Sequence, residues 1–468
     1  MATSSLTLKR EIGLIGGISY IVGTVIGSGI YIFPGAVLQG CGNSIGLTLC
    51  MWVFSGFTSL CGAICYAELG SRIGKSGGDY TYIKESFGNL FGFLYAWMNL
   101  LTRPMSAAIG CMASAEYIMT AVSCSEDIHH SAKTLLTLVI LVFVVCLNGY
   151  SVKLGSYYQT ISTISKIGVL VIIIVAGLIH LGQGHNDNFQ NAFNTENVTV
   201  LGLSKAFYAS YFAYGGFTIP ISIILGVLLT IIAYVSTIIA YHAVLTNSQI
   251  TSDVAVAYVF AQHKLGFFQW VILPTIGLFA AVSANFNVFQ SSRLNFVAGR
   301  DNLFPRWLSM VNFKSRTPLV SILLLMVTAS LVIIFVNIRS ILSTYTFLKI
   351  LGTFLSILSL KRIRKQYPDS STTLKTVKCC VLTVSNYCFL TAPLLCPVVY
   401  VTITLLVCIV FLVFDIQAML SVTILLGSGA IAYLISTETP LCKISPLKPL
   451  NGVYYVQFPN WSAENYAW

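Results

Sequence analysis

Long apolar runs separated by short polar segments dominate the pattern of this chain. Runs of about 20 apolar residues, enough to cross a bilayer as a helix, lie near 12–38, 45–67, 90–121, 133–148, 162–181, 203–245, 265–290, 318–336, 338–360, 393–414 and 419–436. The run 203–245 would be about 64 Å long as one helix, roughly twice the hydrocarbon thickness. We expect it to fold back between Gly215 and Pro220. The pattern predicts an all-α polytopic membrane protein with about twelve transmembrane helices.

Positive charge supports this count. Twelve crossings place the two loops richest in Lys and Arg, 291–317 and 361–392, on the same side as Lys9 and Arg10. Lysine and arginine collect in cytosolic loops of membrane proteins. Counting the run 203–245 as one crossing would put both loops on the opposite side. We therefore expect both termini to be cytosolic.

Composition excludes an ordinary soluble domain, because 56% of the residues are hydrophobic and only 9% are charged. The net charge of +11 does not indicate nucleic acid, since its Lys and Arg residues follow the loop pattern of a membrane protein. The sequence contains no cluster with metal-ligand spacing, no phosphate loop after a strand and no Ser/His/Asp set in a polar pocket. We expect no enzyme activity, catalytic residue, cofactor or metal.

The first apolar run contains a glycine break. Gly27 and Gly29 flank Ser28 near the middle of the run, where each glycine costs about 1 kcal/mol in a helix relative to alanine. In a membrane, unwound backbone is tolerated only where it lines a cavity or is buried in protein. The break therefore suggests a binding site near the midplane. The alternative is that the glycines only let two helices pack closely.

The ends of such a break would suit the two charges of an amino acid. The N–H groups of Ser28, Gly29 and Ile30 would begin a second half-helix, whose positive end suits a carboxylate. The carbonyls that end the first half, around Thr24 to Ile26, suit an ammonium group. We therefore expect the zwitterionic end of an amino acid to bind here.

A second glycine break lies at residues 211–217, in the sixth span. Paired interruptions in two halves of a transporter indicate an inverted repeat with substrate between the halves. The carbonyls of Phe212 and Ala213, just before Gly215, could receive the substrate ammonium, and the ring of Phe212 could close over it as a gate. The alternative for Phe212 is an aromatic core contact.

Two single residues also stand out. Lys166 is alone in the apolar fifth span, where a lysine marks a functional or inter-helix contact. It could supply the positive charge that a sodium ion supplies elsewhere, or it could snorkel to the cytosolic edge. Cys124 lies in a short polar loop on the outer side. An odd cysteine there suggests a disulfide to another chain, with a free surface thiol as the alternative.

Several motifs in order resemble the L-type amino acid transporter light chains, of the amino acid, polyamine and organocation superfamily. These motifs are Ile-Gly-Ser-Gly-Ile-Tyr at 26–31, Cys65-Tyr-Ala-Glu-Leu-Gly, Lys75-Ser-Gly-Gly-Asp-Tyr, Phe212-Ala-Tyr-Gly-Gly and Ser291-Ser-Arg-Leu. The resemblance runs from about residue 8 to 366 and, more loosely, through the last two spans. It implies a five-plus-five inverted repeat with discontinuous helices 1 and 6 and two extra helices.

The resemblance also implies sodium-independent exchange of amino acids at the plasma membrane and a disulfide to a single-pass glycoprotein heavy chain. The position of that disulfide matches Cys124. The family's lysine in the fifth span matches Lys166, and its aromatic gate matches Phe212. The partners implied are the heavy chain, the bilayer and an amino acid.

The chain departs from the family pattern in two places. After Gly215, roughly 20 residues are absent, about what half a span plus a loop requires, so we expect a truncated sixth span. The segment 367–392 is expected to be an atypical cytosolic insertion. The expected division is a cytosolic tail (1–10), a transporter core (11–366), this insertion, two last transmembrane helices (393–436) and a cytosolic tail (437–468). An alternative function follows: a transport-dead chain that only pairs with the heavy chain.

Overall fold

The computed structural model describes residues 29–73, 77–122, 130–185, 187–215, 223–252, 256–266, 269–312, 317–336, 338–367, 392–414 and 416–438. All regular secondary structure in these segments is helical, so the all-α prediction is confirmed. The longer helices are α3 (Pro34–Gly40), α4 (Ile45–Arg72), α5 (Asp79–Phe87), α6 (Asn89–Val122), α7 (His130–Tyr150), α8 (Val152–Gly182), α9 (Val200–Ala213), α10 (Ile223–Val244), α12 (Val256–Lys264), α13 (Gln269–Arg300), α14 (Leu319–Phe335), α15 (Ile338–Gln366), α16 (Leu395–Phe414) and α17 (Ile416–Glu438). Short helical turns are α2 (Gly29–Ile32), η1 (Asp187–Phe189), α11 (Asn247–Ser252) and η3 (Arg306–Ser309).

The described helices include several that can cross a membrane. By length and composition alone, five are long and apolar enough: Ile45–Arg72, Ser131–Tyr150, Lys153–Gly182, Gly226–Val244 and Leu395–Phe414. Helices α6, α13 and α15 are also long but more polar. The chain is therefore a helical membrane protein.

The run 203–245 does not form a single helix, which agrees with the prediction. It is divided between α9 and α10, and α9 ends at Ala213. With 14 residues, α9 is about 21 Å long, shorter than the roughly 30 Å of a hydrocarbon core. The turn is predicted between Gly215 and Pro220, and residues 216–222 lie outside the described residues.

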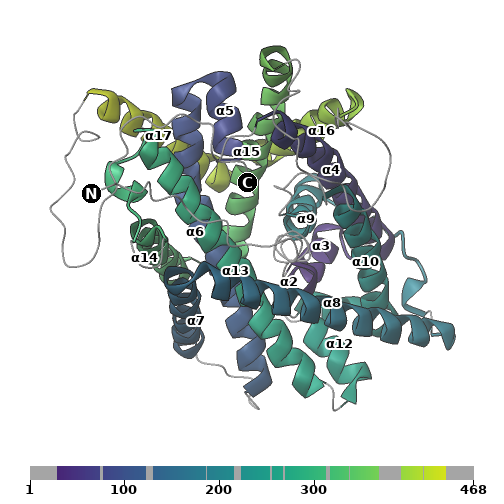
Figure 1. Ribbon diagram of the computed structural model, residues 1–468. Coiled ribbons are helices and arrows are strands. Elements are labelled where there is room, and N and C mark those ends of the chain that lie inside the picture. The colour runs from purple at the N-terminus through teal and green to yellow at the C-terminus, as the bar shows by residue number, and fades with distance from the viewer. Residues whose placement is uncertain are drawn as a thin grey trace, which may run out of the picture.

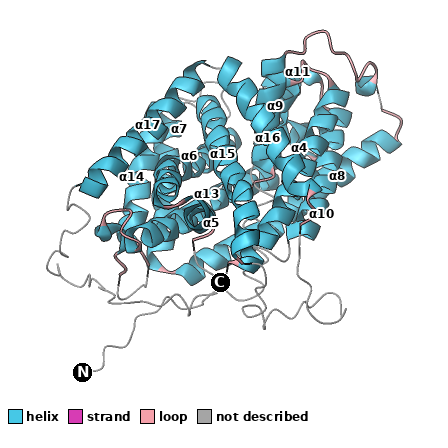
Figure 2. Cartoon of the chain, turned by 90° about the horizontal axis from the view of Figure 1, so that it is seen from above, coloured by secondary structure: helices cyan, strands magenta, loops and turns pink. Residues whose placement is uncertain are grey.

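Helices α6, α13 and α15 lie in the middle of the bundle (Figure 1). On one side stand α7, α14 and α17, and on the other α4, α8, α9 and α10, as the view from above also shows (Figure 2). Helices α6 and α13 pack along each other through small residues. The Ser114 hydroxyl donates to the Gly277 carbonyl at 2.5 Å, and a Cβ on Gly277 would lie 2.8 Å from Ile118. Close packing of this kind replaces the hydrophobic effect as the main attraction between helices in a membrane.

One buried carboxylate joins α4 to α15. Glu68 is 1% exposed and accepts from Arg72 at 2.8 Å, one turn later on α4. Its two oxygens also accept from the Arg364 guanidinium at 2.9 and 2.6 Å and from the backbone N–H of Ala392 at 2.8 Å. Arg364 in turn donates to the Ala392 carbonyl. A single acidic side chain thus fixes the end of α15 and the segment before α16 against α4.

Replacing Glu68 with glutamine should lower the stability of the bundle. The amide cannot neutralise Arg72 and Arg364, and breaking one side of a buried ion pair costs about 3 kcal/mol. Thermal unfolding of the purified chain in detergent measures the loss. Glu196→Gln is the control, because that carboxylate is exposed in the loop before α9. Equal unfolding temperatures for the two variants would contradict this role of Glu68.

Candidate functional site

The N-terminal turn of α2 and the C-terminal turn of α9 touch each other through their backbones. A Cβ built on Gly29 would lie 2.7 Å from both the Cα and the Cβ of Ala213. No residue larger than glycine fits at position 29 without moving one of the two helices. The sequence predicted Gly29, Ile30, Phe212, Ala213 and Gly215 as site residues, and the structure brings Gly29 and Ala213 into contact.

The carbonyls at the end of α9 already have hydrogen-bond donors. The Phe212 carbonyl accepts from the Gly215 N–H at 3.0 Å, and the Tyr211 carbonyl accepts from the Tyr214 N–H at 3.2 Å. The Tyr234 hydroxyl, on α10, donates to the Ala213 carbonyl at 3.1 Å. A carbonyl oxygen has two lone pairs, so the bond from Tyr234 does not by itself exhaust the acceptor capacity of the Ala213 carbonyl.

Phe212 stands between two other aromatic rings. It is half-buried and makes edge-on contacts with Phe33, at 5.2 Å between ring centroids, and with Tyr345 on α15, at 5.4 Å. Phe33 lies at the junction of α2 and α3. This ring therefore links the contact of α2 and α9 to the middle of α15.

Two tyrosines tie α2 to the helices around it. The Tyr31 hydroxyl donates to the backbone carbonyl of Lys166 on α8 at 2.9 Å, and the Tyr117 hydroxyl of α6 donates to the Tyr31 carbonyl at 2.6 Å. Lys166 itself is only 1% exposed. Its burial favours an inter-helix contact over snorkelling to the edge of the bundle.

Four predicted site residues, Thr24, Ile26, Gly27 and Ser28, lie outside the described residues, and so does Cys124. The first half of the predicted break in the first span is therefore not described. Of the three half-helix ends expected to meet a substrate, the structure describes parts of two, the turn from Gly29 onward and the end of α9.

Comparison with known proteins identifies the family. The model of the amino acid permease family matches residues 12–435. The chain belongs to the amino acid permease family. This permease is similar to three curated transporters: b(0,+)-type amino acid transporter 1 of Mus musculus (34% identity over 76% of this chain and 77% of that protein), the cystine/glutamate transporter of Homo sapiens (35%, 77% and 75%) and Asc-type amino acid transporter 1 of Mus musculus (32%, 78% and 73%).

These relatives confirm the resemblance to the L-type amino acid transporter light chains. They are transporters by name, which is consistent with the expectation that the permease is not an enzyme. Among the described residues, no group of three or more His, Cys, Asp and Glu side chains could hold a metal ion.

Sequence reasoning missed a second intramembrane lysine in this permease. Lys349 lies on α15, and its Nζ would overlap a Cβ added to Gly215 at the end of α9. The signal was the same as for Lys166, a single lysine inside an apolar run. The sequence could not show which face of the run points towards α9.

The contact between Gly29 and Ala213 can be tested by adding one methyl group. Gly29→Ala should lower the stability of the permease by about 1–3 kcal/mol, the usual penalty of overpacking, because neither backbone can yield without moving its helix. Thermal unfolding of the purified chain measures the change.

Gly226→Ala is the matched control for this substitution. Gly226 is also helical, in α10, and a Cβ added there meets nothing within 4 Å. Alanine is the better helix former, so this variant should be as stable as the parent or slightly more stable. The contact is refuted if Gly29→Ala behaves in the same way.

Proposed function

We propose that this permease exchanges amino acids across a membrane without sodium, by alternating access. The observation that carries the proposal is the contact between Gly29 of α2 and Ala213 of α9. A helix start, with its positive dipole end, suits a carboxylate, and a helix end suits an ammonium group. An amino acid carries both charges on one carbon, so two adjoining half-helix ends match it.

In this proposal each half-helix end recognises one charge. The backbone N–H groups at Gly29 and Ile30, with Gly27 and Ser28 before them, bind the substrate carboxylate. The ammonium group binds to carbonyls at Phe212, Ala213 and Gly215 and, from the other side, at Thr24 and Ile26. The second lone pair of the Ala213 carbonyl serves this purpose while Tyr234 holds the first. This set of residues comprises the proposed substrate site.

Two further residues have supporting roles. Phe212, packed between Phe33 and Tyr345, closes over the substrate as a gate. Lys166, whose backbone carbonyl accepts from Tyr31 of α2, supplies a fixed positive charge inside the bundle. Because that charge is covalently attached, it takes the place of a sodium ion and makes transport independent of a sodium gradient.

The proposed topology has twelve crossings in a five-plus-five inverted repeat followed by two helices. Both termini are cytosolic, and the membrane is the plasma membrane. Residues 214–222 separate the end of α9 from the start of α10. This segment is too short for a second half-helix and a loop. This supports a truncated sixth crossing, and in the proposed division the core 11–366 is followed by an inserted segment, 367–392.

The transport-dead alternative has no observation in its favour. It was raised because half of the sixth span is absent. The described end of α9, however, keeps the contact with α2 that the proposed substrate site needs, and the relatives are named as transporters. We therefore keep transport as the proposed function.

Exchange in proteoliposomes tests this function. Uptake of labelled amino acids, from a panel of acidic, neutral and basic ones, should rise several-fold when the vesicles are preloaded with unlabelled substrate. It should not change when sodium is replaced with choline, because no ion gradient drives the cycle. Protein-free vesicles are the control. Uptake that collapses without sodium, or no uptake of any amino acid, would contradict the proposal.

We also propose that the permease pairs with a single-pass glycoprotein heavy chain through Cys124. The support is the resemblance to heteromeric light chains and the position of Cys124 in the sequence, between the end of α6 and the start of α7. That loop is on the outer side in the proposed topology, where conditions are oxidising and disulfides persist.

The disulfide can be seen on a non-reducing gel of cell membranes. The parent chain should run as a larger adduct that disappears with reducing agent, and Cys124→Ser should abolish the adduct because it removes the only thiol assigned to the bond. Cys50→Ser is the control, since Cys50 is an exposed free thiol on α4. An adduct that persists in Cys124→Ser would rule out this linkage.

A further inference from the structure

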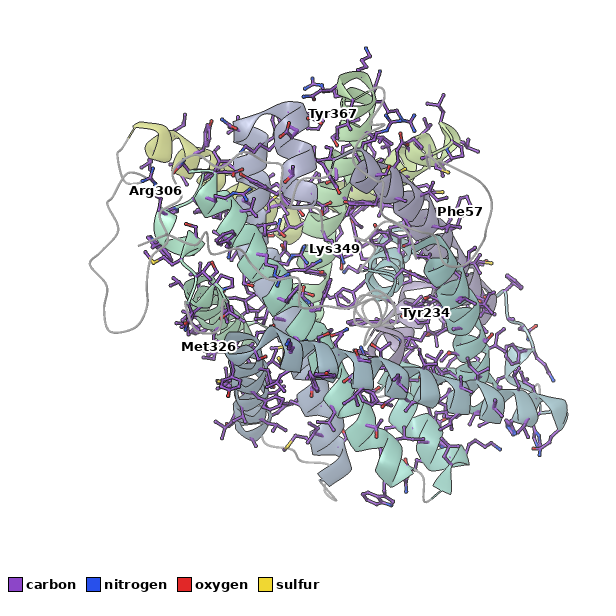
Figure 3. All side chains as sticks on the ribbon, in the orientation of Figure 1. Phe57, Tyr234, Arg306, Met326, Lys349 and Tyr367 are labelled. Carbon is purple, nitrogen blue, oxygen red and sulfur yellow. The ribbon has the colours of Figure 1, made fainter. Side chains whose placement is uncertain are left out.

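Lys349 lies deep within its helix. It is about 16 Å from the first residue of α15 and about 25 Å from the last, at 1.5 Å per residue. Figure 3 shows it in the interior of the bundle, far from Tyr367 just past the end of the same helix. A lysine at membrane depth is costly, and it persists where it serves a substrate or an inter-helix contact.

The ammonium group of Lys349 adjoins the proposed substrate site. It lies over the ring of Tyr345 at 5.7 Å, and Tyr345 packs against Phe212. It is also so close to Gly215 that a Cβ there would overlap it. The charge therefore lies beside the end of α9, on the side that faces α15.

A second cation lies near the first. Arg103 of α6 donates to the amide oxygens of Asn99, at 3.1 Å, and Gln290. Both partners are neutral. Arg103 and Lys349 lie on helices that pack against each other, α6 and α15. In the described part of the chain, the ion pairs involve neither of them.

Neither cation makes an ion pair in the described part of the chain, and the Asp79 carboxylate of α5 is bound to the Tyr95 hydroxyl at 2.8 Å. The two positive charges therefore favour an anion next to the site, in surroundings of low dielectric. The negative end of α9 could by itself attract Lys349. That attraction does not account for Arg103, which is held by neutral amides instead of a helix end. An anion between the two cations would offset both charges.

We propose that the substrates of this chain are amino acids with an acidic side chain, and that Lys349 selects them. This inference rests on the proposed exchange function. The α-carboxylate and ammonium bind at the ends of α2 and α9, and the second carboxylate binds Lys349, with Arg103 adding to the field. A neutral side chain leaves both cations unpaired, and a basic side chain is repelled.

The test compares three labelled substrates, L-glutamate, L-leucine and L-arginine, in proteoliposomes that contain the full-length chain. The parent should prefer glutamate. Lys349→Gln should lower glutamate uptake relative to leucine by about tenfold or more, equivalent to about 1.4 kcal/mol. Lys349→Arg should retain the preference, because it keeps the charge. Lys361→Gln is the matched control, an exposed lysine on the same helix whose loss should change nothing.

Each other outcome overturns a distinct statement. A parent that prefers leucine or arginine, or an unchanged preference in Lys349→Gln, refutes the acidic substrate class and leaves the exchange function standing. Equal loss of all three substrates in Lys349→Gln, with normal unfolding temperature, shows that Lys349 only supports the end of α9, and it also refutes selection. Exchange of none of the three by the parent refutes both the proposed function and this inference.

Discussion

The structure depends on one constraint, that backbone groups inside a membrane must be satisfied by protein. A helix that ends within the bundle leaves carbonyls without intrahelical partners. At the end of α9 these carbonyls are held by Gly215, Tyr214 and the hydroxyl of Tyr234. The first described turn of α2 is pressed against the same turn of α9, at a distance that only glycine at position 29 allows. The end of α9 is thus held by its own backbone cap, by Tyr234 and by this contact.

The surrounding helices position this contact through tyrosine hydroxyls and aromatic rings. Tyr31 and Tyr117 connect α2 to α8 and α6 through backbone carbonyls, and the ring of Phe212 connects α9 to α15. Such buried hydroxyls fix the orientation of the helices as well as stabilising them, because each hydroxyl must find a hydrogen-bond acceptor. A movement of α2 or α9 would therefore change their contacts with α6, α8 and α15, as the proposed alternating access requires.

The sequence predicted those features that are local. The helical fold and the division of the run 203–245 each depend on residues close together in the chain, and the structure confirms both. The sequence could not predict contacts between helices that are far apart in the chain. Arg364 reaches Glu68 across 296 positions, and the lysine at 349 meets the end of α9 because of how two helices face each other. Helical periodicity gives little help there, since apolar residues cover nearly every side of such spans.

An experimental structure of the full-length chain in a lipid nanodisc, with its transported amino acid added, tests the central claim most directly. The account predicts that the first span is interrupted before Gly29 and that the amino acid lies between the first turn of α2 and the last turn of α9. A helix that runs without interruption through Gly29, with the amino acid bound elsewhere or absent, would contradict it.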